Sequence, residues 1–135
     1  MGVNRIGFVN GCFDILHLGH KRLLEFAKNH CDYLIVAIDE DVRVKELKGS
    51  DRPFNPFEDR KEMLSAFSYV DEVVGFSSRN ALSSLIKSIN PDIMVIGSDY
   101  REQEVIGSQY AKELVFFDRI EGYSTSKIVE RSCCG

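Results

Sequence analysis

Two of the three histidines in this chain, His17 and His20, lie three residues apart in the stretch GCFDILHLGH, which runs from Gly11 to His20. The stretch follows a short apolar run and leads into KRLLEFAKNH, which has the periodicity of an amphipathic helix. The pair is therefore expected on one face of the first helical turn, directly after a strand. A helix N-terminus attracts phosphate, and two imidazoles there can donate hydrogen bonds to oxygens whose charge grows in a transition state.

Two other interpretations of the histidine pair remain open at this point. The first is a helix cap with a packed histidine. The second is a metal site, which needs further ligands at compatible distance, and the candidates are Cys12, His30 and Cys31. His30 lies ten residues beyond His20 along the predicted helix, roughly 15 Å away at ~1.5 Å per residue. This distance disfavours a metal site.

Apolar runs typical of buried strands alternate along the chain with amphipathic patterns typical of helices. The sequence predicts strands over 6–10, 33–38, 72–76, 92–97 and 114–117, and helices over 19–29, 40–47, 56–67, 80–89, 102–108 and 124–131. This alternation predicts a single α/β domain over residues 1–135, with a Rossmann-like, doubly wound, parallel five-stranded sheet and helices on both faces. Residues 132–135 are expected to form a frayed tail. Ligands of such sheets bind beyond the carboxyl ends of the strands.

Several anion-binding candidates follow the predicted strands. Lys45 and Lys48 lie in VKELKG, and Arg52 and Arg60 lie in DRPFNPFEDR. Their side chains suit phosphate, although the lysines equally fit a solvated helix face and Arg60 a surface position. A run of hydroxyl residues, STS at 124–126, opens the last predicted helix, where it suits either an N-cap or a phosphate.

Two stretches near opposite ends of the chain resemble the signatures of the cytidylyltransferase-like nucleotidyltransferase superfamily. GCFDILHLGH resembles its H-x-G-H signature with the G-x-F-D lead-in, and EGYSTSKI resembles its S-T-[ST]-x-I signature. The resemblance implies transfer of a nucleotidyl group from ATP or CTP to a small phosphorylated acceptor, with release of pyrophosphate. In this reaction His17 and His20 bind the triphosphate and stabilise the pentavalent transition state.

The resemblance also assigns candidate roles to other residues. Gly11 allows close approach of the nucleotide, and Asp14 orients the loop or serves as a turn aspartate. Mg²⁺ is implied as a cofactor that rests mainly on the phosphates, so no metal ligand is assigned to the protein. The catalytic candidates are His17, His20 and Lys48; the nucleotide-binding candidates are Gly11, Cys12, Phe13, Asp14, Gly19, Lys45, Gly97, Asp99, Arg119, Tyr123, Ser124, Thr125 and Ser126; the acceptor-binding candidates are Arg52 and Arg60.

Two branches of the superfamily compete. KGSDRPFN and GSDYREQEVIG resemble the sugar-phosphate adenylyltransferases of ADP-heptose synthesis, although Ile96 and Ser98 replace the Lys and Gly of that branch. Arg119 in RIEGYST resembles the glycerol-3-phosphate cytidylyltransferases, which use CTP. We expect the adenylyl branch. A non-catalytic nucleotide-binding module and a relative of class I aminoacyl-tRNA synthetases are the less favoured alternatives.

Composition narrows the choice of partners. The net charge is −4 and the pI about 5.4, which disfavours nucleic-acid binding. No apolar run is long enough to span a membrane, and no signal peptide is recognisable, so a cytoplasmic location is expected. Cys12 and Cys31 are expected to be buried and reduced, and Cys133 and Cys134 to lie in the tail. The resemblance implies a homodimer.

Overall fold

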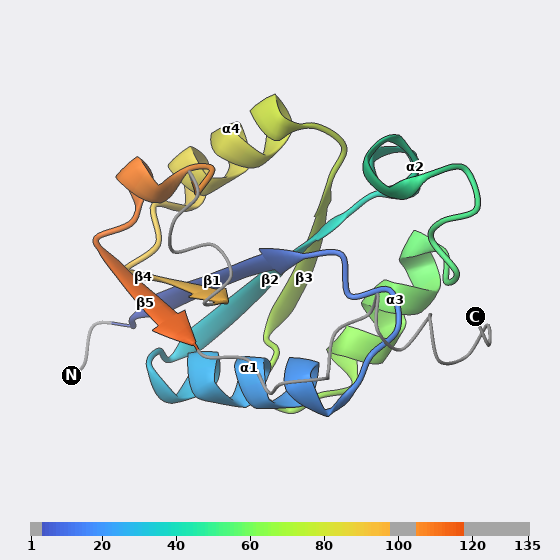
Figure 1. The fold of residues 1–135 in the computed structure, drawn as a ribbon. Helices are drawn as coiled ribbons and strands as arrows, with labels where there is room; N and C mark the ends of the chain where they lie inside the picture. Colours follow the sequence, from blue (N-terminus) through green and yellow to red (C-terminus); the bar gives the residue numbers. More distant parts are fainter. Residues whose placement is uncertain (1–3, 98–104, 118–135) are drawn as a thin grey trace.

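The computed structural model describes residues 4–97 and 105–117. Strands and helices alternate through this part of the chain (Figure 1). The elements are β1 (Ile6–Gly11), α1 (Leu18–Asn29), β2 (Tyr33–Asp39), α2 (Asp41–Lys48), α3 (Phe57–Ser65), β3 (Glu72–Phe76), α4 (Arg79–Ile89), β4 (Ile93–Gly97), the 3₁₀ helix η2 (Ser108–Tyr110) and β5 (Glu113–Phe117).

The five strands form one sheet in the order β3-β2-β1-β4-β5, and every neighbouring pair is parallel. This sheet confirms the predicted doubly wound α/β fold. The strand order changes direction between β1 and β4, which is the point where ligands of such sheets bind. The loop after β1 contains the histidine pair, so the fold places that pair at this point.

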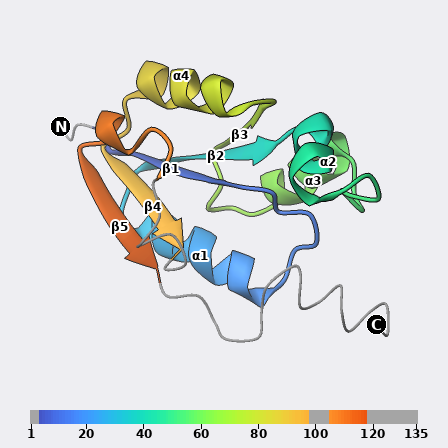
Figure 2. The same ribbon diagram turned by 45° about the horizontal axis from the view of Figure 1, so that its top comes forward.

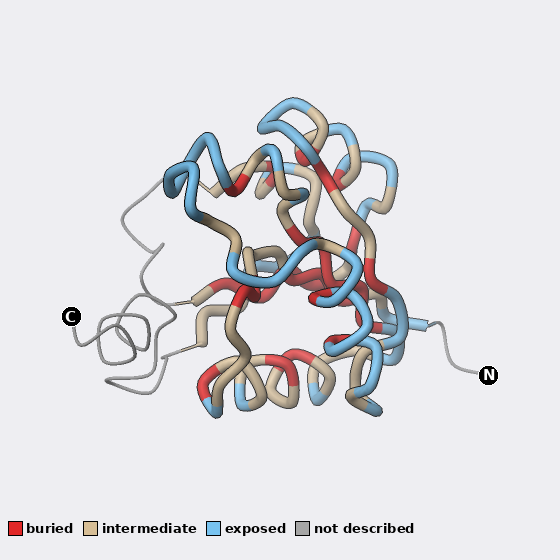
Figure 3. Tube along the Cα trace, turned by 90° about the vertical axis from the view of Figure 1, so that its right-hand side faces the viewer, coloured by how far each residue is buried: buried red, intermediate tan, exposed pale blue. Residues whose placement is uncertain are grey.

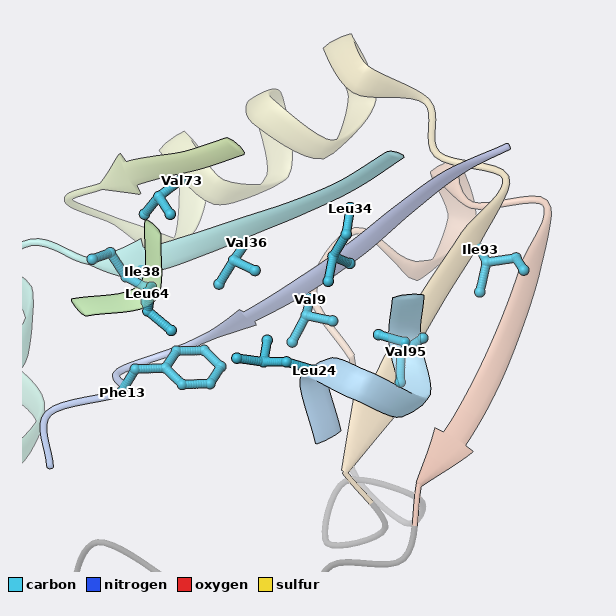
Figure 4. Packing of buried hydrophobic residues seen from close by; sticks show 11 residues of the cluster. Val9, Phe13, Leu24, Leu34, Val36, Ile38, Leu64, Val73, Ile93 and Val95 are labelled. Atoms are coloured by element: carbon cyan, nitrogen blue, oxygen red, sulfur yellow. The ribbon is translucent and has the colours of Figure 1, made fainter. Parts of the chain in front are cut away.

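Helices cover both faces of the sheet: α1 and α3 lie on one face and α4 on the other (Figure 1). Each face has its own hydrophobic core, because successive residues of a strand point to opposite sides. Leu24 of α1 and Leu64 of α3 pack with strand residues in one cluster (Figure 4), whereas Leu82 and Ile86 of α4 pack in the other. Burial is concentrated in the strands and the inner helix faces (Figure 3).

The predicted elements in the described part of the chain agree with the structure to within two residues, with one exception. The helix predicted over 102–108 is wrong for residues 105–107, which form a turn before η2 begins at Ser108. Gly107 has a φ of +78°, a left-handed conformation that an α-helix does not accommodate. Residues 102–104, the helix predicted over 124–131 and the tail at 132–135 lie outside the described residues. No helix among the described residues is long and apolar enough to cross a membrane.

Gly107→Ala is expected to lower the free energy of unfolding by about 1–3 kcal/mol, because the new Cβ would be both strained and overpacked. That Cβ would lie 2.5 Å from Cδ1 of the buried Ile86. Gly97→Ala is the matched control, since a Cβ at Gly97 would meet no atom of the described residues within 4 Å. Urea denaturation of both variants checks the prediction, and an equal loss in the two would contradict it.

Candidate active site at the carboxyl edge of the sheet

The two histidines together cap helix α1. His17 is the N-cap residue in an extended conformation, and its Nδ1 accepts a hydrogen bond of 3.0 Å from the backbone N–H of Gly19. The backbone N–H of His17 in turn donates to Nδ1 of His20 at 3.2 Å. This reciprocal pair is a capping box made of two imidazoles. The helix cap that the sequence offered as one interpretation of the pair is therefore present.

The capping bonds also determine which nitrogen of each ring can serve a ligand. Because both Nδ1 atoms accept backbone hydrogen bonds, the proton of each neutral imidazole is assigned to Nε2. The two rings stack with centroids 3.8 Å apart, and the ring of Phe13 lies 5.0 Å from that of His20. The pair is thus held rigidly, with Nε2–H as the donor of each ring.

His20 is neutral at physiological pH. Burial lowers its pKa most, and the neighbouring His17 and the ammonium of Lys48 lower it further, to about 3. A neutral imidazole donates a hydrogen bond without adding a charge that the site would have to desolvate. His20 is therefore suited to hydrogen-bond donation rather than to ion pairing.

The carboxylate of Asp14 joins the loop after β1 to the loop before α3. It is fully buried, and it accepts hydrogen bonds from the backbone N–H groups of Phe54 at 2.8 Å and Asn55 at 2.9 Å. It also accepts from Nε of Arg52 at 3.3 Å, while the side-chain amide of Asn55 donates to the carbonyl of Asp14. Asp14 thus orients a loop, as one of its two predicted roles required.

Arg60 has a different environment from the one predicted. Its side chain is fully buried rather than at the surface. The guanidinium donates to the carbonyls of Cys12 at 3.0 Å and Asp39 at 2.7 Å. It also donates to the carbonyl of Asn55 at 3.0 Å and the carboxylate of Asp41 at 2.8 Å. Through these four acceptors the guanidinium joins the segment after β1, the end of β2 and helix α2 to helix α3.

The remaining cations gather around helix α2, which lies with α3 beyond the end of β2 (Figure 2). Lys45 is exposed, and its Nζ donates to the carbonyl of Arg52 at 3.2 Å. The exposed Lys48 acts electrostatically on both His20 and Cys12, so its ammonium lies close to the histidine pair. The Nη2 atom of Arg52 has no hydrogen-bond partner among the described residues, which leaves donor capacity for an anion.

The other predicted nucleotide-binding residues fall into two groups. Among the described residues, a Cβ at Gly11 would lie 3.0 Å from the ring of Phe13, so this glycine has an internal packing reason as well as the predicted one. Phe13 is buried and has a φ of +50°. Cys12 and Cys31 are half-buried free thiols. At the end of β4, a Cβ at Gly97 would meet no atom of the described residues within 4 Å. Asp99, Arg119, Tyr123, Ser124, Thr125 and Ser126 lie outside the described residues, as do Cys133 and Cys134.

Three residues of this region were not among the sequence-based candidates. Asn55 holds the Asp14 loop, Asp41 pairs with Arg60, and Asp39 ends β2 beside Lys48. Asn55 closes the K-G-x-x-R-P-x-N pattern, which was the available signal for it. No comparable signal marked Asp39 or Asp41, because their partners lie on other elements of the fold.

Asp14→Ala is expected to lower the free energy of unfolding by about 3 kcal/mol, because it removes the buried acceptor of two backbone N–H groups and of the Arg52 guanidinium. Asp51→Ala is the control, since Asp51 is exposed in the same loop and its loss should change stability little. Chemical denaturation measures both. A loss of stability in Asp14→Ala no larger than that in Asp51→Ala would contradict the stabilising role of the Asp14 hydrogen bonds.

His20 is expected to make the protein less stable as the pH falls from about 6.5 toward 3. The folded-state pKa lies below the ordinary value of 6.5, so the unfolded chain binds the extra proton in this window and stability rises with pH. Asp39, whose pKa is raised mainly by burial, contributes in the opposite direction at the acidic end. The measurement therefore compares the pH dependence of the unfolding free energy of the wild-type chain with that of His20→Asn, which keeps an acceptor for the N–H of His17. The slope between pH 6.5 and 5 should be smaller in the variant. An unchanged slope would contradict the prediction.

Comparison with known proteins gives the family. The family model for cytidylyltransferase-like proteins matches residues 8–131. The bifunctional protein HldE of Helicobacter hepaticus is 49% identical over 127 residues, which are 94% of this chain and 26% of the relative. HldE of Nitratiruptor sp. is 52% identical over 127 residues, with 94% of this chain and 27% of the relative covered. The chain thus spans about a quarter of the length of these curated relatives.

Solved structures share the fold at lower identity. A lipopolysaccharide core biosynthesis protein from Thermoplasma volcanium superposes with a TM-score of 0.75 at 22% identity, covering 88% of this chain and all of that one. Pantoate-beta-alanine ligase from Francisella tularensis superposes with a TM-score of 0.64 at 18% identity, covering 95% of this chain and 65% of that one. The family predicted from the two signatures is confirmed by the family model and the curated relatives: this chain belongs to the cytidylyltransferase-like family.

Proposed function

We propose that this domain transfers the adenylyl group of ATP to a phosphorylated sugar of the heptose 1-phosphate kind and releases pyrophosphate. The observation that carries the proposal is the histidine capping box at the N-terminus of α1, in which Nδ1 of each ring accepts a backbone hydrogen bond. A helix N-terminus with two imidazoles is suited to a triphosphate.

The proposed reaction needs no protein nucleophile. A phosphate oxygen of the acceptor attacks the α-phosphorus of the nucleotide in line, and the bond from that phosphorus to the bridging oxygen of pyrophosphate breaks. Both electrons of the broken bond leave with pyrophosphate. The acceptor oxygen is already ionised near neutral pH, so the protein contributes positioning and stabilisation of the charge that grows on the phosphate oxygens.

Each candidate residue has a role in this reaction that matches its chemistry. His17 and His20 donate from Nε2 to the triphosphate, and Lys48 balances the negative charge of the transition state. Arg52 binds the acceptor phosphate, and Asp14 holds Arg52 and its loop in place. This assignment is supported by the position of Asp14 and the histidine pair, which lie in the same segment after β1.

Magnesium enters this proposal with the nucleotide, as part of the Mg–ATP substrate. The described residues contain no group of three or more metal-ligating side chains. The N–H groups of the histidines and the ammonium of Lys48 suit phosphate oxygens rather than a divalent cation. The phosphates of the nucleotide would therefore supply most of the ligands of Mg²⁺.

The adenylyl branch is favoured by two segments of the sequence and by the relatives. KGSDRPFN includes Arg52 and Asn55, both of which contact Asp14. The 49% and 52% identities to two HldE proteins support the same branch. CTP and glycerol 3-phosphate are the second candidate pair, because RIEGYST at Arg119 resembles the cytidylyltransferases.

Two further properties belong to the proposal. We place the domain in the cytoplasm, where nucleotides and sugar phosphates are available, and we infer a homodimer from the family resemblance. Sedimentation of the purified chain measures the second property directly.

Pyrophosphate release is expected only with ATP plus heptose 1-phosphate when ATP, CTP, GTP and UTP are each tested with heptose 1-phosphate and with glycerol 3-phosphate. His17→Asn is expected to reduce kcat by about 10²–10³, the usual cost of removing one preorganised donor. Asparagine is itself a good N-cap, so this variant removes Nε2–H while keeping α1 capped.

The outcomes separate the alternatives. Turnover only with CTP and glycerol 3-phosphate would replace the adenylyl proposal by the cytidylyl one. ATP binding without turnover with either acceptor would contradict the proposed acceptor. A His17→Asn protein that keeps full kcat would contradict the role of the histidine pair.

A further inference from the structure

Asp39 places a carboxylate at the carboxyl end of β2, next to the start of α2. Its side chain is 13% exposed, and Oδ1 lies 3.6 Å from Nε of Arg43. The backbone carbonyl of Asp39 accepts from the buried guanidinium of Arg60 at 2.7 Å, so the residue is held in place from behind. None of the roles proposed above uses this carboxylate.

The carboxylate belongs to the same space as the histidine pair. Asp39 follows Ile38, which pairs with Gly11 across β1 and β2, and the same Nη1 atom of Arg60 donates to the carbonyls of Asp39 and Cys12. Cys12 directly follows β1, which is the neighbour of β2 in the sheet. In the sheet, β2 and β4 lie on opposite sides of β1. Asp39 is therefore on the β2 side of the segment after β1, and the switch point between β1 and β4 is on the opposite side.

A carboxylate at this position is unsuited to phosphate. Both substrates of the proposed reaction are anions, and a negative charge beside their binding groups repels them. Burial also raises the pKa of Asp39, because water no longer stabilises its charge fully. The groups that a carboxylate binds best without a charge penalty are hydroxyl donors, and sugars present several of them.

We propose that Asp39 accepts a hydrogen bond from a hydroxyl group of the acceptor and so selects hydroxylated sugar phosphates over simple phosphate monoesters. The identity of the acceptor rests on the proposed function, but the recognition of a hydroxyl group does not depend on turnover. Asp39 is then a specificity-determining residue, which the nucleotide half of the reaction does not require.

A purely structural role for Asp39 makes a different prediction. Asp39 and Arg43 are four residues apart and form an ion pair across the start of α2. If that pair only stabilises α2, the loss of either partner should affect every phosphate ligand alike. If Asp39 reads a hydroxyl group, its loss should affect hydroxylated and plain phosphates differently.

The test measures binding of two ligands by calorimetry, heptose 1-phosphate and ethyl phosphate, to the wild-type chain and to Asp39→Ala, Asp39→Asn and Arg43→Gln. Asp39→Ala should weaken heptose 1-phosphate about ten- to hundredfold, as expected for one hydrogen bond to a charged group. Its affinity for ethyl phosphate should stay equal or increase, because a repelling charge is removed. Asp39→Asn keeps an acceptor oxygen and should lie between. Arg43→Gln should change both ligands by the same factor.

Three results would overturn the inference: equal factors for the two ligands in Asp39→Ala, a wild-type protein that binds ethyl phosphate as tightly as heptose 1-phosphate, or a wild-type protein that does not bind heptose 1-phosphate. Failure of the proposed function is distinguishable from these results. A wild-type chain without turnover, whose Asp39→Ala variant still loses heptose 1-phosphate selectively, would refute the reaction and support the hydroxyl contact.

Discussion

The guanidinium of Arg60 is a full positive charge without contact to water, and the arrangement of the site follows from how that charge is compensated. Removing such a group from water is costly unless acceptors surround it. Its acceptors come from the segment after β1, from the last residue of β2, from the loop before α3 and from Asp41 of α2. Helix α2 buries only Val44 and leaves Val42 and Leu47 more than half exposed, so apolar packing holds it weakly. The contact between Arg60 and Asp41 accounts for its position.

This compensation joins parts of the site that the chain supplies separately. Helix α2 carries Lys48, and the segment after β1 carries the histidines. Arg60 ties both to α3, and Asp14 adds a second connection between the β1 segment and the loop of Arg52. The groups proposed to bind phosphate are therefore mounted on one scaffold of buried hydrogen bonds. Positioning of this kind is the main contribution a protein makes to a reaction that needs no protein nucleophile.

The groups around the scaffold differ in whether they are neutral or charged. Burial, the adjacent His17 and Lys48 keep His20 neutral. In the proposed reaction the histidines donate hydrogen bonds, while lysine and arginine supply positive charge. Neutral imidazoles and charged lysine or arginine side chains can all donate hydrogen bonds to phosphate oxygens. A neutral donor does not add to the electrostatic repulsion among the cations. Asp39 is the one carboxylate among the groups proposed to contact substrate, and the proposed hydroxyl partner is compatible with its negative charge.

The sequence by itself determined the alternation of strands and helices, the parallel sheet, the location of the histidines at the start of α1 and, through two signatures, the family. These features depend on hydrophobic periodicity and on short motifs, which are local along the chain. Only the tertiary structure decided that Arg60 is buried, that Asp14 binds residues 38 to 41 positions away and that one guanidinium binds the carbonyls of Cys12 and Asp39. Periodicity shows which face of an element is apolar, but the partner of a buried charge depends on which elements meet in space.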